Sequence, residues 1–139
     1  MNGSPRSAAY STTQGTRQAT ILIVENEVSN RMLVERVLST RGYRCLSAEN
    51  GREALSILDR EPVDLILTDL SMPVLDGYQT AQLIRQRPGL AEVPIVAVTA
   101  YALSDVNEKA MRVGCTDYLT KPFKPRQLLE VVERLLPAR

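Results

Sequence analysis

The sequence predicts a doubly wound α/β fold built on a five-stranded parallel sheet with strand order 2-1-3-4-5. From residue 20 onward, short apolar runs alternate with segments whose apolar residues recur at helical spacing. Three of the runs are continuously apolar and do not alternate with polar residues, which is typical of strands covered on both faces. Successive strand–helix units joined by right-handed crossovers give the doubly wound arrangement.

The strands are expected at residues 21–24, 44–47, 65–68, 95–98 and 117–120. The first helix is expected over 29–41, because its apolar residues share one face: Leu33, Val34, Val37 and Leu38. Gly42 follows it at a position that favours a left-handed stop.

The remaining helices are placed by their end signals. The second begins at Asn50, with Glu53 three residues later as the partner in a capping box. The third follows Gly77 and ends before Pro88. The fourth covers about 104–113, and the fifth begins at Pro125, a residue suited to a first helical turn.

Composition excludes several classes of function. The chain has 139 residues, a net charge of +1 and no histidine, which gives no basic stripe for nucleic acid and no histidine-based zinc site. No apolar run approaches the ~20 residues that span a bilayer. Cys45 and Cys115 fit no metal or redox spacing and indicate apolar side chains in a reducing cytoplasm. Residues 1–19 lack periodicity, so we expect a flexible tail before one domain over 20–139.

Polar residues follow four of the predicted strands at the point where each strand ends. Glu25 and Asn26 follow 21–24, Asp69 follows 65–68, Thr99 follows 95–98 and Lys121 follows 117–120. The carboxyl ends of parallel strands meet at one edge of the sheet, and ligands bind there at the switch point of the strand order. We therefore expect these side chains to form one site.

The residue types at this edge indicate phosphoryl chemistry. Two acids in one crevice repel each other, and Mg²⁺ relieves this because it uses one or two carboxylates with water and phosphate oxygens. A carboxylate acceptor, a metal, a hydroxyl and an ammonium are the groups that hold a phosphoryl group. Each residue alone has a structural explanation, as a cap, a turn former or a surface lysine. Their coincidence at separate strand ends favours a site that accepts a phosphoryl group and does not turn over a substrate.

Four stretches resemble the response-regulator receiver domain of two-component signalling: ILIVE at 21–25, LILTDLSMPVLDG at 65–77, VAVTA at 96–100 and DYLTKPF at 117–123. The resemblance covers roughly 20–136 and implies a flavodoxin-like (βα)5 domain. It implies that Asp69 takes a phosphoryl group from a histidine kinase or a phosphotransfer protein. Glu25 and Asn26 match the pair that organises Mg²⁺, and Ser71 matches a metal ligand through its backbone carbonyl.

The resemblance also assigns roles to residues near the later strands. Thr99 matches the hydroxyl that moves onto the phosphoryl group, Lys121 the ammonium that pairs with it, and Ala100 the small residue beside it. Tyr118 matches an aromatic that swings inward as Thr99 moves. Pro122 matches a proline preceded by a cis peptide bond.

Phosphorylation is expected to switch an output face on the fourth helix, the fifth strand and the fifth helix. This output face should include Lys109, Arg112, Tyr118, Lys124 and Gln127. The expected partners are a histidine kinase or phosphotransfer protein and a downstream protein, with neither nucleic acid nor membrane. The expected oligomeric state is a monomer or a weak homodimer.

One residue departs from the receiver pattern, because Asn26 stands where the second acid is usual. An amide carbonyl still ligates a metal but carries no charge, so we expect weaker Mg²⁺ binding and slower phosphorylation. The alternative interpretation is a degenerate receiver that binds partners without phosphorylation.

Two further alternatives are that the protein is a phosphatase and that the chain is part of a longer protein. Haloacid-dehalogenase-type phosphatases need a second acid two residues after the nucleophile, where this chain has Ser71. We therefore expect no enzyme beyond self-phosphorylation and autodephosphorylation. A stand-alone receiver is the leading interpretation, and a receiver cut from a hybrid kinase is close behind.

Overall fold

The computed structural model describes residues 18–71, 75–100 and 104–136. The strands are β2 (Thr20–Val24), β3 (Arg44–Ala48), β4 (Leu65–Asp69), β5 (Ile95–Thr99) and β6 (Asp117–Thr120). The helices are α1 (Val28–Ser39), α2 (Gly51–Leu58), α3 (Gly77–Arg85), α4 (Ser104–Arg112) and α5 (Pro125–Leu135). The predicted elements are all present, with ends within one or two residues of their expected positions.

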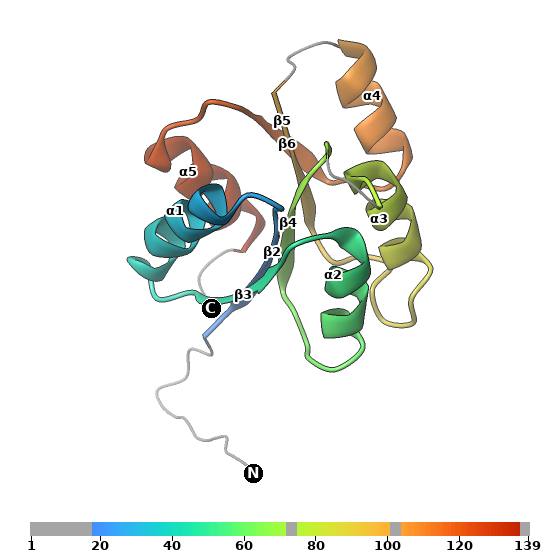
Figure 1. Ribbon diagram of the computed structural model, residues 1–139, viewed down its shortest axis with the longest axis horizontal. Coiled ribbons are helices and arrows are strands. Elements are labelled where there is room, and N and C mark those ends of the chain that lie inside the picture. The colour runs from blue at the N-terminus through green and yellow to red at the C-terminus, as the bar shows by residue number, and fades with distance from the viewer. Residues whose placement is uncertain (1–17, 72–74, 101–103, 137–139) are drawn as a thin grey trace.

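The described strands form one parallel sheet in the order β3-β2-β4-β5-β6, which is 2-1-3-4-5 along the chain. Figure 1 shows α1 and α5 on one face of this sheet and α2, α3 and α4 on the other. The predicted doubly wound, flavodoxin-like fold is therefore confirmed. Its switch point lies between β2 and β4, the two strands at which the chain changes direction across the sheet.

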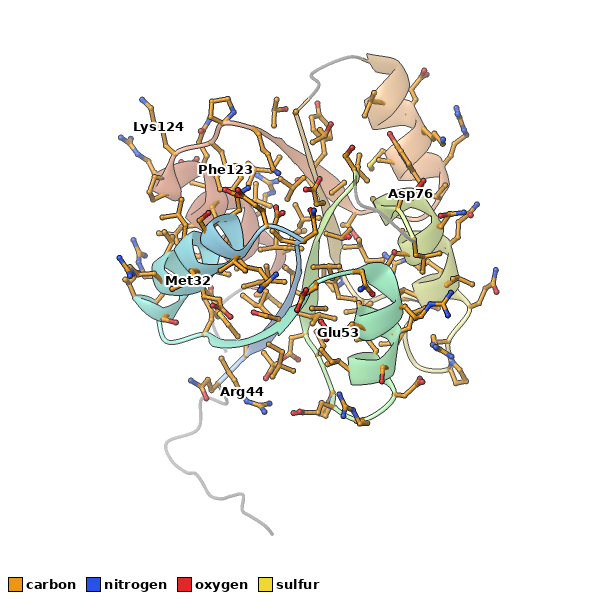
Figure 2. The ribbon with its side chains drawn as sticks, viewed as in Figure 1. Met32, Arg44, Glu53, Asp76, Phe123 and Lys124 are labelled. Atoms are coloured by element: carbon orange, nitrogen blue, oxygen red, sulfur yellow. The ribbon has the colours of Figure 1, made fainter. Side chains whose placement is uncertain are left out.

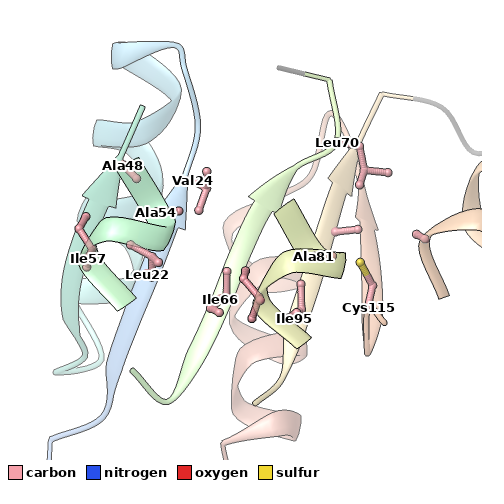
Figure 3. Close-up of a cluster of buried hydrophobic side chains, with 13 residues drawn as sticks. Leu22, Val24, Ala48, Ala54, Ile57, Ile66, Leu70, Ala81, Ile95 and Cys115 are labelled. Carbon is pink, nitrogen blue, oxygen red and sulfur yellow. The ribbon is translucent and has the colours of Figure 1, made fainter. Parts of the chain in front are cut away.

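Two apolar clusters fill the spaces between the sheet and its helices. Leu22 and Ile66 belong to the cluster beneath α2 and α3, which Figure 3 shows, whereas Ile21 and Leu65 belong to the cluster beneath α1 and α5. Successive strand residues thus enter opposite clusters, which explains why these runs are continuously apolar and do not alternate with polar residues. Each such side chain contributes about 1.5–3 kcal/mol when fully buried.

Local side-chain contacts fix the starts of α2 and α3. Asn50 accepts a hydrogen bond from the backbone N–H of Glu53 at 2.8 Å, but the Glu53 carboxylate accepts from Glu49 at 2.6 Å. The expected capping box at α2 is therefore half formed, with its return bond shifted by one residue. At α3, Asp76 and Gln79 form a complete capping box through bonds of 2.8 and 3.1 Å.

Helix α1 differs from the expected packing in one respect. Leu38 is fully buried, whereas Leu33, expected on the same face, is 57% exposed. With 3.6 residues per turn, the four apolar residues span an arc of about 140° with Leu33 and Leu38 at its two edges, and α1 is turned so that the Leu38 edge faces the core. Val28 and Met32 are likewise more than half exposed, so α1 carries apolar side chains on its outer side as well.

Helix length and the state of the cysteines can be described directly from the structure. Within the described ranges, no helix is long and apolar enough to cross a bilayer. Both cysteines are free thiols, with Cys115 buried and Cys45 partly buried. The expected tail falls almost wholly outside the described residues, so its flexibility stays a prediction.

Candidate functional site

The sheet register brings the predicted site residues to one edge. Val24 pairs with Thr68, so the residues that follow them, Glu25 and Asp69, are neighbours across the switch point. Asp69 in turn pairs with Val98, the residue before Thr99. The Lys121 backbone N–H donates to the Thr99 carbonyl at 2.7 Å, which anchors the lysine beside the same strand ends.

The two acids share one ammonium group. Lys121 Nζ lies 3.1 Å from Asp69 Oδ2 and 3.3 Å from Glu25 Oε1, and both acidic residues are only 7% exposed. The second oxygen of each carboxylate accepts a backbone N–H, from Ser71 at 3.1 Å for Asp69 and from Glu27 at 2.9 Å for Glu25. Buried carboxylates require such partners, and the arrangement fixes how both are oriented.

The surroundings of Lys121 change the pKa of its ammonium group. Burial alone would lower the pKa of its ammonium group, but the hydrogen bond and attraction to Asp69, with Glu25 adding to both, raise that pKa above its usual value. The lysine is therefore a fixed positive charge at the site. With two carboxylates and one ammonium, these three side chains carry a net charge of −1.

The oxygen donors of the site fit a hard divalent cation that needs few protein ligands. A site with three or more His, Cys, Asp or Glu ligands, such as a zinc site, does not occur among the described residues. Glu25 and Asp69 offer two carboxylates, and Asn26 and Ser71 lie on the exposed rim beside them. This donor set suits Mg²⁺, which usually keeps several waters, and does not suit zinc.

The remaining predicted residues lie where the strand ends place them. Thr99 is buried at the end of β5, and Ala100 after it is exposed. The Lys121–Pro122 peptide bond is cis, as predicted. Tyr118 on β6 is 39% exposed, an outward position.

The residues of the predicted output face are exposed, but several have structural contacts as well. Lys109 Nζ lies 4.2 Å from the centre of the Tyr78 ring, which links α4 to α3. Lys124 precedes α5, and its backbone N–H donates to the Gln127 side chain at 2.7 Å. Arg112 is exposed on the last turn of α4. A role of this face in output stays a prediction.

Two features were missed by sequence reasoning. Arg31 on α1 donates to the backbone carbonyl of Glu25 at 2.8 Å and so holds the loop that presents the acid. A cavity of about 440 Å³ also opens beside Asp69, with mainly apolar side chains from α1, the sheet and α5 around it. Arg31 follows no motif, and the cavity depends on how two distant helices pack, so neither leaves a signal in the sequence.

A comparison with known proteins gives the family. Residues 21–133 match the family model described as the response regulator receiver domain. The chain belongs to this family. The receiver domain is a module of two-component signalling, and histidine kinases are among the proteins with which receiver domains interact.

Particular relatives share most of the chain. It is 38% identical over 124 residues to the sensor histidine kinase GacS of Pseudomonas protegens, covering 86% of this chain and 13% of the kinase. The receiver domain of the sensor histidine kinase PA1611 from Pseudomonas aeruginosa, described with a magnesium ion coordinated in its active-site cleft, matches with a TM-score of 0.80 and 37% identity over 86% of this chain and 98% of that one. The chemotaxis protein CheY4 of Vibrio cholerae matches with a TM-score of 0.83 and 31% identity over 86% and 99%.

The chain spans only part of several relatives. It covers 13% of the GacS kinase and 44% of a probable transcriptional regulator, ycf27, from Porphyridium aerugineum, to which it is 44% identical over 110 residues. Because some relatives are named as transcriptional regulators, the expected absence of nucleic-acid partners stays a prediction.

Proposed function

We propose that Asp69 accepts a phosphoryl group from the histidine of a kinase or phosphotransfer protein, with Mg²⁺ bound beside it. The observation that carries this proposal is the contact of the Asp69 carboxylate, 7% exposed, with the Lys121 ammonium at 3.1 Å and its position next to Glu25. The magnesium described for the PA1611 receiver domain supports the choice of cation.

The chemistry needs no general base because the acceptor is already an anion. An oxygen of Asp69 forms a bond to phosphorus while the bond from phosphorus to the imidazole nitrogen breaks, and the electron pair leaves with the imidazole. Lys121 pairs with the incoming negative charge. When bound by Glu25, Asp69, Asn26 and the Ser71 carbonyl, Mg²⁺ supplies charge neutralisation for the phosphoryl oxygens.

The phosphoryl group would act as a local electrostatic switch. It adds roughly −1.5 to −2 charges to a site whose three charged side chains sum to −1. Thr99 and Lys121 both favour the phosphorylated state, and the segment after Thr99 leads into α4. A shift of their positions would change the output face for a downstream protein.

The test is the intact mass of the protein after incubation with acetyl phosphate and Mg²⁺, followed by transfer from a phosphorylated phosphotransfer protein. We expect one added phosphoryl group in the parent and in Asp59→Asn, which removes an acid that is 55% exposed. Asp69→Asn should gain none. The absence of an adduct in the parent with both donors would overturn the proposal.

Asn26 supports a second candidate function. Its neutral amide stands exposed beside two buried acids, at the position where the family usually has another acid. A receiver with a weakened metal site could bind its partners without phosphorylation. If Asn26→Asp is phosphorylated and the parent is not, this second function is the correct one.

A further inference from the structure

The loop between β2 and α1, residues 25–27, carries two of the metal ligands proposed above, and its end at α1 lacks a capping side chain. Glu27 stands at the N-cap position of α1 and makes no capping hydrogen bond through its side chain. Asn50 and Asp76 make that bond at the starts of α2 and α3. Another contact therefore has to hold this loop against α1.

Arg31 of α1 supplies that contact. Its guanidinium donates to the Glu25 carbonyl at 2.8 Å, and its backbone N–H donates to the Glu27 carbonyl at 3.0 Å. The Glu25 carbonyl belongs to the planar peptide group that joins Glu25 to Asn26, so its direction also sets where the backbone N and Cα of Asn26 lie. Arg31 thus orients the residue at which this chain departs from the receiver pattern.

The carboxylate of Glu25 is held in place without Arg31. It accepts hydrogen bonds from the Lys121 ammonium at 3.3 Å and from the Glu27 backbone N–H at 2.9 Å. The backbone N–H of Glu25 donates to the Ala48 carbonyl at 3.0 Å. Loss of the Arg31 side chain would therefore leave the acid anchored and would release the peptide group that leads to Asn26.

The charge of Arg31 is unfavourable where it lies. The guanidinium is near the N-terminal end of α1, where the helix dipole favours negative groups. It is also hydrogen-bonded to a loop proposed to bind a cation, and like charges repel. Any benefit of Arg31 to a metal site therefore has to come from its hydrogen bond to the loop.

We propose that Arg31 is a positioning residue for Mg²⁺, because it holds the peptide between Glu25 and Asn26 so that the neutral amide of Asn26 can ligate the ion. The inference rests on the proposed function, since the ion is the same. A carboxylate still attracts a cation when it is slightly misplaced, whereas a neutral amide oxygen contributes only at ligand distance. The dependence on Arg31 should therefore be stronger with Asn26 than with an acid at that position.

The experiment titrates Mg²⁺ into isotope-labelled protein and follows the backbone amide NMR signals, which gives the dissociation constant without any phosphoryl transfer. Arg31→Met removes the donor and keeps an unbranched stem. We expect the dissociation constant to rise about tenfold, because loss of a group that orients a metal ligand typically costs roughly 10–100-fold in affinity. The half-saturating Mg²⁺ concentration for labelling by acetyl phosphate should rise by the same factor, whereas the rate at saturating Mg²⁺ should not change.

Two other residues of α1 provide matched controls. Arg36→Met removes the same kind of charge from the last turn, at the other end of the helix. Met32→Gln changes the residue next to Arg31, which is 54% exposed and is labelled on α1 in Figure 2. Both variants should bind Mg²⁺ as the parent does. A tenfold loss in either one would assign the effect to α1 as a whole and overturn the inference.

The Asn26→Asp background tests whether Arg31 acts through the amide. There, Arg31→Met should raise the dissociation constant by about threefold at most, because the added carboxylate attracts the ion by its charge. An equal loss in both backgrounds would overturn the inference, as would unchanged or tighter binding by Arg31→Met in the parent, where the lost repulsion would then outweigh positioning. Both results would leave the proposed function intact. A parent that binds no Mg²⁺ would overturn both proposals.

Discussion

Arg85 links two segments at the end of the domain opposite the phosphoacceptor, and its replacement tests how far partly buried backbone carbonyls depend on one side chain. Its guanidinium donates to Gly114 O at 2.9 and 2.7 Å, to Leu90 O at 3.0 Å and to Val93 O at 2.6 Å. These carbonyls belong to the segment after α3 and the segment after α4. Arg85→Met keeps most of the apolar stem but removes every donor.

The expected cost follows from the number of carbonyls left without a donor. A hydrogen bond from a charged donor contributes about 1.5–3 kcal/mol, and an unsatisfied buried group costs about 1–3 kcal/mol. Arg85 is only partly buried, so water can reach some of the freed carbonyls and the lower end applies. Three carbonyls at about 1 kcal/mol each give a loss of about 3 kcal/mol in the free energy of unfolding.

Urea denaturation followed by far-UV circular dichroism measures this loss. The matched control is Arg44→Met, because Arg44 pairs with Glu61 at 2.8 Å on the surface, where both side chains are well exposed. Surface pairs contribute about 0–1 kcal/mol, so the control should change little. If Arg85→Met loses no more stability than Arg44→Met, the reasoning about the carbonyls is wrong.

Three further predictions concern single residues. Gly77→Ala should lower the free energy of unfolding by about 3 kcal/mol, because a Cβ would lie 2.3 Å from the Asp69 carbonyl oxygen; an unchanged urea midpoint would refute this close approach. Burial raises the pKa of the Cys115 thiol to about 11 from 9.0, so the unfolded chain ionises first; stability should be fully present below pH 9 and fall by about 2 kcal/mol toward pH 11. Cys115→Ala should remove that part of the alkaline loss, and parallel pH profiles for the two proteins would contradict it. Asn26→Asp should tighten Mg²⁺ binding about tenfold by calorimetry, because it adds a charged ligand; equal affinities would exclude the effect.

The sequence predicted the elements because each depends on local chemistry. The apolar runs fixed strands β2, β4 and β5, and Asp76 and Gly77 marked the start of α3. The candidate site could also be predicted from the sequence, because a parallel sheet brings the residues at its strand ends together independently of the loop conformations. Asp69 and Lys121 lie in contact for that reason, although 52 positions separate them.

Contacts set by the packing of separate elements could not be predicted. The position of Leu33 at the edge of the buried arc depends on how α1 is rotated against the sheet and α5. The bonds from Arg31 to Glu25 and from Arg85 to Gly114 join a side chain to a backbone carbonyl, and every residue has such a carbonyl. No pattern of residue types therefore marks them.

The charge of the site determines how Asn26 should affect phosphorylation. Replacing an acid with an amide removes a ligand charge for Mg²⁺, but it also removes a repulsion that the incoming phosphoryl oxygens would meet. Once Mg²⁺ is bound, the lost ligand charge and the lost repulsion act on the rate of phosphoryl transfer in opposite directions. Only the lost ligand charge changes the affinity for Mg²⁺. The parent and Asn26→Asp should thus be phosphorylated at rates within about threefold of each other at saturating Mg²⁺ and differ by about tenfold at limiting Mg²⁺. A tenfold difference that persists at saturation would show that the amide impairs phosphoryl transfer itself.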